Sequence, residues 1–291
     1  MNEPAPATFE RAARWHQWAP RWLPGRIATR VRRLVLKRYA GVVVCRLPTG
    51  QRFAADPADL LQCLVVTTGG WEQLIFDAVQ PLVDPGSTVL DIGAHVGYAA
   101  LRFADWVGAS GRVVCFEPVP GHVAQLERNL QLNDFTSRAT VVAMAVSDQA
   151  AVREFYEDKG SNSGMGSLDS YGRMAATRQI RTIAVDDWLS RNGVSDLALT
   201  KVDVEGAEAL VIRGMAHSLG DARHRSVLIE LHDGIVPAIG REVAAMFDAL
   251  AGRPYRLYDW QSDRFVEVRH DEPANYLLAV RGDSAHLIAA S

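Results

Sequence analysis

The stretch V-L-D-I-G-A-H-V-G-Y, residues 89–98, decides the fold of this chain. A short apolar run ends at the carboxylate Asp91, and Gly93 and Gly97 lead into a segment with helical periodicity. The pattern predicts a buried strand that turns sharply into a helix, since glycine permits the tight turn and a close approach of ligand to backbone. The turn and the helix N-terminus offer N–H groups. Asp91 repels a pyrophosphate there and attracts an ammonium or sulfonium group.

S-adenosylmethionine (SAM) carries both of these cations, so the stretch favours methyl transfer as the function. The alternative is an ordinary strand–turn–helix junction in which Asp91 caps the helix. The motif G-x-G-x-x-G is missing, which weakens the case for a dinucleotide and for an NAD-dependent oxidoreductase.

Strand and helix patterns alternate from residue 88 onward. Predicted strands lie at 88–92, 112–116, 140–146, 197–202 and 226–231, and predicted helices at 98–106, 122–132, 207–219 and 236–250. This order predicts an α/β fold with a doubly wound, mostly parallel sheet. The carboxyl ends of its strands share one edge, where ligands bind. Asp91, Glu117, Asp203 and Glu230 each end a strand, so we expect them to meet there.

Composition narrows the class of protein. The 291 residues are 48% hydrophobic and 22% charged with a net charge of −3, which is typical of a globular domain and gives no signal for nucleic acid. Cys45, Cys63 and Cys115 are widely spaced, which fits a reducing compartment and argues against a zinc site. No apolar run reaches the length of a membrane span. We therefore expect a cytoplasmic location.

The N-terminal part differs from the rest in charge. Residues 11–38 hold nine Lys or Arg and no Asp or Glu, and residues 26–38 have the pattern of an amphipathic helix. This basic arm suits an anionic membrane surface, an acidic carrier protein, the partner subunit of a homodimer, or packing on the chain's own acidic body. A hairpin is predicted at 41–54 and a helix at 71–82. The expected organisation is a helical and hairpin extension at residues 1–70, followed by the main domain at residues 71–285.

Two further strand ends complete the nucleoside site. Glu117 lies 20 residues beyond Gly97, where an acid accepts hydrogen bonds from a ribose diol in both NAD and SAM sites. Ala143–Asp148 ends the third strand, and its small apolar residues suit the face of an adenine.

The run K-V-D-V-E-G-A-E, residues 201–208, gathers charge at the end of a buried strand. Lys201, Asp203 and Glu205 alternate to one side of it, and such charges are costly at a buried strand end without a task. In the next strand Glu230 and His232 share a face, and His232 suits the role of general base. Asp203, Glu230 and His232 are also apt ligands for a divalent metal. Salt-bridged turns are the structural alternative.

Assembled, these motifs resemble the FkbM-type family of SAM-dependent methyltransferases. The resemblance runs from Glu72 to Asp233, and more weakly to near Val280. It is carried by V-L-D-I-G-A-H-V-G-Y, F-E-P-V-P, N-L-Q-L-N, A-V-S-D, the Gly/Ser-rich loop at 158–170, V-D-D-W-L and K-V-D-V-E-G-A-E. It implies a seven-stranded sheet of the class I methyltransferase type and O-methylation of natural-product hydroxyls and sugars.

The same resemblance assigns residues to the cofactor. It implies that SAM is held by Asp91, Gly93, His95 and Gly97 at its methionine end, by Glu117 at its ribose, and by Ala145 and Val146 near its adenine, with Glu72 approaching the methionine end. The family often has Asn where this chain has His95. An imidazole still donates one hydrogen bond, so we expect a repositioned contact.

The predicted reaction is an in-line attack of a substrate hydroxyl on the sulfonium methyl, with Asp203, Glu205 and His232 around that hydroxyl. His232 is the preferred base, and Asp203 orients it or binds a metal. Two alternatives stay open: N-methylation of a similar small molecule, and a non-catalytic nucleoside-binding protein of the same fold.

Overall fold

Burial of both faces of strand β3 (Thr88–Ile92) explains the layered architecture. Val89 packs into one hydrophobic core, whereas Leu90 and Ile92 pack into a second core on the opposite face of the sheet. Successive side chains of a strand point to opposite faces, so a strand that is apolar on both must lie between two layers of helices. The computed structural model describes residues 41–157, 164, 166–168, 176–232, 239–252, 254–268 and 275–288.

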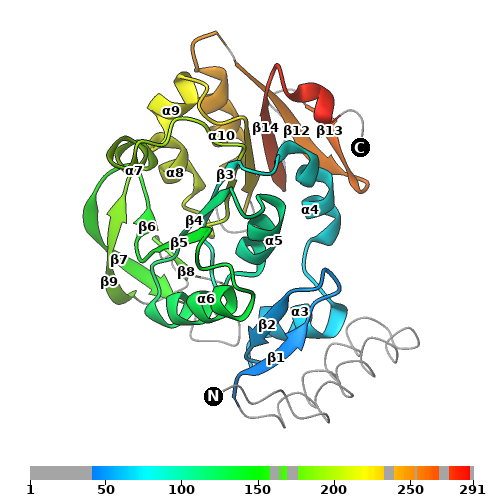
Figure 1. Cartoon of the computed structure of the whole chain (residues 1–291). Coiled ribbons are helices and arrows are strands. Elements are labelled where there is room, and N and C mark those ends of the chain that lie inside the picture. The colour runs from blue at the N-terminus through cyan, green and yellow to red at the C-terminus, as the bar shows by residue number, and fades with distance from the viewer. Residues whose placement is uncertain are drawn as a thin grey trace.

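The central sheet has the strand order β13-β12-β14-β11-β10-β3-β4-β5 (Figure 1). Its other strands are β4 (Arg112–Phe116), β5 (Ala139–Val142), β10 (Leu199–Val202), β11 (Ser226–Glu230), β12 (Tyr255–Gln261), β13 (Arg264–Glu267) and β14 (Tyr276–Arg281). Strands β5, β4, β3, β10 and β11 are parallel, and β14 runs antiparallel to β11 and β12. The doubly wound, mostly parallel α/β fold is thus confirmed. Among the described residues this central sheet has eight strands where seven were predicted, because β13 extends its edge as the hairpin partner of β12.

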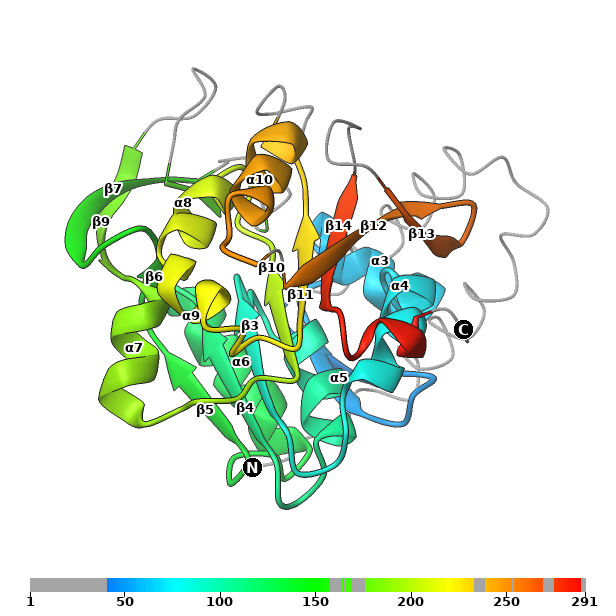
Figure 2. The same ribbon diagram turned by 90° about the horizontal axis from the view of Figure 1, so that it is seen from above.

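Helices cover both faces of this sheet, as Figure 2 shows. One layer contains α4 (Gln73–Val79), α5 (Tyr98–Trp106) and α6 (Pro120–Leu132). The other contains α7 (Val185–Asn192), α8 (Glu208–Arg213), α9 (Ala216–Gly220) and α10 (Ile239–Asp248). The single helix predicted at 207–219 is divided into α8 and α9, and Gly214 lies between them. A Cβ at Gly214 would lie 2.0 Å from the backbone oxygen of Ser147, so the glycine permits close packing there.

A second, four-stranded sheet has the order β6-β9-β7-β8. It is formed by β6 (Ala145–Val146), β7 (Ala151–Glu157), β8 (Gly166–Ser167) and β9 (Ala176–Ile183). Most of the loop at 158–170 lies outside the described residues.

The predicted hairpin is β1 (Val43–Arg46) and β2 (Arg52–Ala55). Asn129 of α6 holds it: the backbone N–H of Ala54 donates to Asn129 Oδ1 (2.7 Å), and Asn129 Nδ2 donates to the oxygen of Val96 (2.8 Å). The helix predicted at 71–82 is α4 followed by the 3-10 turn η2 (Gln80–Leu82), because Pro81 interrupts the α-helical hydrogen bonds. Sequence reasoning missed α3 (Leu60–Thr68), which begins at the N-cap Asp59.

The basic arm at 11–38, with its predicted helix at 26–38, lies outside the described residues. Its proposed membrane, carrier-protein and dimer contacts therefore stay predictions. Within the described part of the chain, no helix combines the length and apolarity needed to cross a bilayer.

Candidate active site

Glycine brings the turn after β3 against its neighbours. Gly93 has a φ of +81°, and a Cβ at this position would lie 1.8 Å from the backbone oxygen of Asp203. Gly97 has a φ of +91°, and its Cβ would lie 2.4 Å from Cδ1 of Leu126 in α6. The first motif therefore lies directly beside the end of β10, as the shared sheet edge predicts.

Asp91 is fully buried on this edge. Neither of its carboxylate oxygens accepts a hydrogen bond from the described residues, and Lys201 Nζ lies 4.0 Å from Oδ1. Burial raises the pKa of Asp91 to about 6, although the charge of Lys201 acts against this shift. A buried carboxylate without donors is unfavourable, so this site suits a ligand that brings a positively charged donor.

Glu117, also buried, ends β4 and is held by backbone donors. The N–H groups of His95 and Val119 each donate to its carboxylate at 2.9 Å. Nδ1 of His122, in the first turns of α6, lies 3.3 Å from Oε1. Burial and the neighbouring His122 lower the pKa of His95 to about 4, so His95 is neutral at pH 7.

A pocket of about 700 Å³ adjoins Glu117. The predicted cofactor residues that line it are Gly93, His95, Glu117, Ala145 and Val146. Asp91, Gly97 and Glu72 are not part of this lining. Asp203 and Glu205 of the predicted catalytic group line it too. The combination of an apolar end, a carboxylate and glycine turns suits a nucleoside with a charged tail.

Lys201 and Asp203 form a partly buried ion pair at the end of β10, with 2.9 Å between Nζ and Oδ2. Burial favours the neutral amine, but the charges of Asp203 and Asp91 outweigh it and raise the pKa of Lys201. Burial likewise acts against the Asp203 carboxylate, and the charge of Lys201 nevertheless holds its pKa below the usual value. Both groups are therefore ionised at neutral pH.

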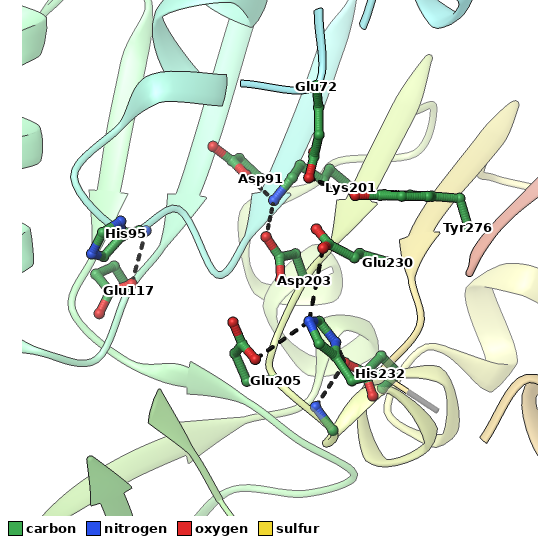
Figure 3. A network of polar contacts seen from close by, with 12 residues as sticks. Glu72, Asp91, His95, Glu117, Lys201, Asp203, Glu205, Glu230, His232 and Tyr276 are labelled. Atoms are coloured by element: carbon green, nitrogen blue, oxygen red, sulfur yellow. Dashed lines mark hydrogen bonds and ion pairs between the residues drawn. The ribbon is translucent and has the colours of Figure 1, made fainter. Parts of the chain in front are cut away.

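His232 lies among three carboxylates (Figure 3). Its Nδ1 is 3.2 Å from Glu208, and its Nε2 is 3.3 Å from Glu205 and 3.8 Å from Glu230. Burial favours the neutral imidazole, but the Glu208 hydrogen bond and the charges of Glu205 and Asp203 raise the pKa of His232 to about 10. Burial and the charge of Asp203 raise the pKa of Glu205 to about 7 and that of Glu230 to about 9.

Glu72 joins the site from the N-cap of α4. Its carboxylate accepts a hydrogen bond from the hydroxyl of Tyr276, which is paired with Glu230 in the register of β14 and β11. Burial and the charge of Asp203 raise the pKa of Glu72. Glu72, His95 and Glu205 all adopt left-handed backbone conformations, with φ of +51°, +49° and +54°. Such strain in non-glycine residues clusters at functional sites.

Comparisons with known proteins agree with this geometry. The family described as "Methyltransferase FkbM domain" matches residues 91–257. The chain belongs to the FkbM methyltransferase family. This confirms the family predicted from the sequence, and with it the enzyme class and SAM as the cofactor.

Three proteins with assigned names are similar to this chain in sequence. "2-O-methyltransferase NoeI" of Sinorhizobium fredii is 28% identical over 159 residues, which cover 50% of this chain and 64% of NoeI. "31-O-demethyl-FK506 methyltransferase FkbM" of Streptomyces tacrolimicus is 30% identical over 193 residues, covering 56% of this chain and 71% of that protein. "Hexuronic acid methyltransferase AglP" of Haloferax volcanii is 26% identical over 149 residues, which cover 50% of this chain and 56% of AglP.

Among solved structures, a SAM-dependent O-methyltransferase from Thermotoga maritima aligns over 82% of this chain and 77% of its own. The two are 15% identical, with a TM-score of 0.43.

A candidate metal cluster in this FkbM-family chain differs from the predicted trio. Donor atoms of Asp203, Glu205 and His232 lie within 4.8 Å of one another, so Glu205 takes the place foreseen for Glu230. Carboxylate and imidazole donors fit a divalent cation. The ring nitrogens of His232 already contact three carboxylates and hold a proton. A metal ion would bind a ring nitrogen only after displacing that proton.

The sequence motifs did not predict two residues of the site, Tyr276 and His122. Tyr276 lies more than 40 residues beyond the last motif and enters only because β14 is antiparallel to β11. His122 follows Glu117 by five residues at the start of α6, and a histidine in that helical turn could have been expected to face the strand end.

Proposed function

We propose that this chain transfers a methyl group from SAM to a hydroxyl oxygen of a small molecule, a sugar or another natural product. The observation that carries the proposal is the grouping of side chains at one edge of the central sheet. There the pocket lined by Glu117, Asp203 and Glu205 lies on the same sheet edge as Asp91, a buried carboxylate that accepts no hydrogen bond from the described residues. NoeI and FkbM, by their names, also act at oxygen.

The residues present fit SAM. Asp91 would pair with its ammonium group, Glu117 has lone pairs left for its ribose diol, and Ala145 and Val146 offer an apolar wall for its adenine. When bound, SAM supplies a methyl group on a sulfonium whose leaving group is a neutral thioether.

The protein's task is to align the acceptor hydroxyl and to remove its proton. Asp203, fixed by Lys201, orients that hydroxyl at the wall of the pocket. Glu205 shares this wall, and its pKa of about 7 suits a base at neutral pH. The carboxylates around His232 hold its proton. We therefore assign the base to Glu205 and a positioning role to His232, in place of the base role predicted for His232.

Single-turnover transfer of labelled methyl from SAM tests this assignment. The acceptors would be neutral glycosides, cyclohexanols and hexuronic acids, with amines for the N-methylation alternative. Glu205→Gln is expected to reduce transfer by about 10²–10⁴-fold while SAM binding in calorimetry is retained. Glu242→Gln, which alters a surface ion pair with Arg213, is the control.

Full activity of Glu205→Gln alongside an inactive His232→Gln would return the base role to His232. Binding of SAM without transfer to any acceptor would favour the non-catalytic alternative. Unchanged transfer in the presence of EDTA is the expected result if no metal takes part.

A further inference from the structure

A second pocket, of about 660 Å³, lies beside the site. It is formed by the loop between α3 and α4, by the start of α4 and by the end of β12. Its lining includes Thr68, Gly70, Glu72, Leu74, Ile75 and Trp260. Because β12 runs in the same direction as β11, its end lies on the edge of the sheet that carries the catalytic carboxylates.

Glu72 belongs to both the second pocket and the polar network (Figure 3). Its carboxylate contacts the hydroxyl of Tyr276 and faces the pair formed by Lys201 and Asp203, and Asp203 lines the first pocket. A row of polar groups thus leads from one pocket to the other. Methyl transfer needs two such neighbouring compartments, one for the donor and one for the acceptor.

The walls and mouth of the second pocket are apolar. The indole of Trp260 is held against Phe265, with ring centroids 4.9 Å apart and an angle of 68° between the planes. Leu74 is 56% exposed, although it is a large apolar side chain. An exposed apolar rim around a polar floor is typical of a ligand site.

Carboxyl groups outnumber cations around this floor. Glu72, Asp203, Glu205 and Glu230 approach one another, while the facing cations are Lys201 and His232, each already paired with carboxylates. Burial and the charge of Asp203 already raise the pKa of Glu72, Glu205 and Glu230, so a ligand that brought a further carboxylate into this partly buried place would meet the same penalty.

We propose that this second pocket is the acceptor subsite and that it takes an uncharged, hydroxyl-bearing ring such as a neutral sugar. One hydroxyl reaches Glu72 and Tyr276, and the apolar face of the ring lies on Trp260. The inference rests on the proposed function and adds a selection by charge. A ring with a carboxylate, of the kind that the name of AglP indicates, is disfavoured here.

Saturation-transfer NMR on the full chain, with S-adenosylhomocysteine added, tests the subsite without requiring turnover. The probes are methyl β-D-glucopyranoside and the anionic methyl β-D-glucopyranosiduronate, which differ only at C6. The neutral probe is expected to bind at least about tenfold more tightly, the smallest effect expected for one added like charge in a partly buried place.

Two variants locate the bound ring. Trp260→Ala and Leu74→Ser are expected to lose the signal of the neutral probe, and Leu74→Ser leaves the contact between Trp260 and Phe265 intact. Val152→Ser is the matched control, because Val152 is a 64% exposed apolar residue on β7, outside the pocket.

Absence of glucoside binding to the unaltered chain, equal binding of the glucuronide, or an unchanged signal in Leu74→Ser would each overturn the subsite. Calorimetry with SAM on the same samples separates the two proposals. Glucoside binding without SAM binding would refute the proposed function alone, and SAM binding without glucoside binding would refute the subsite alone.

Discussion

Replacing Lys201 by methionine removes the cation that lies between a buried carboxylate, Asp91, and a partly buried one, Asp203. Its Nζ is 2.9 Å from Asp203 Oδ2 and 4.0 Å from Asp91 Oδ1. At an effective dielectric constant of about 20, these separations correspond to attractions of about 6 and 4 kcal/mol. Desolvation of the three groups offsets much of this sum. The expected loss of unfolding free energy is therefore about 3–5 kcal/mol, the cost typical of leaving a buried ion pair without one partner.

Urea denaturation of Lys201→Met beside a surface control measures this loss. Asp84→Asn removes a shorter ion pair, 2.7 Å from Arg225, but Asp84 is 72% exposed on its side chain and the expected effect is below about 1 kcal/mol. Adding Asp203→Asn to Lys201→Met should restore part of the lost stability, because the stranded carboxylate is then neutral. Equal effects of Lys201→Met and Asp84→Asn, or strictly additive changes in the double variant, would refute this account of the buried pair.

Three further outcomes are expected. Gly93→Ala should abolish SAM binding in calorimetry, because its Cβ would lie 1.8 Å from the Asp203 backbone oxygen, whereas Gly121→Ala meets no atom within 4 Å and should bind normally. Glu117→Gln should weaken SAM binding by about 10- to 100-fold, the worth of hydrogen bonds to a charged acceptor, and unchanged affinity would remove Glu117 from the ribose site. Burial lowers the pKa of His224 to about 3, against 6.5 ordinarily, so between these values the unfolded chain binds more protons and stability rises with pH. Urea denaturation should show a loss of up to about 1.4 kcal/mol per pH unit on acidification, and an equal slope in His224→Gln would contradict this origin.

Local signals made much of the fold predictable. Apolar runs that end in a carboxylate and a glycine identify strand β3 and its turn, and a repeated strand–helix order identifies the doubly wound sheet. The meeting of Asp91, Glu117, Asp203 and Glu230 on one edge then follows from right-handed crossovers. None of these inferences needs the placement of a side chain.

What stayed out of reach depends on contacts between distant segments. Tyr276 joins the site only through the antiparallel pairing of β14 with β11, and no local pattern specifies that pairing. The charge state of His232 follows from Asp203, Glu205 and Glu208 together, which lie in a different part of the chain from His232. A pattern can name the titratable groups, but it does not give the distances that set their pKa values.

The side chain of Asn129 has a consequence for how this chain can be divided. It bonds both the hairpin strand β2 and the Val96 carbonyl that immediately precedes the turn glycine at position 97. A fragment starting at the boundary predicted at residue 71 would remove Ala54, the donor to Asn129 Oδ1, and leave that buried oxygen without its partner behind the glycine turn. Chimaeras that exchange N-terminal segments between family members should therefore be joined ahead of Val43, so that strands β1 and β2 come from the same protein as Asn129.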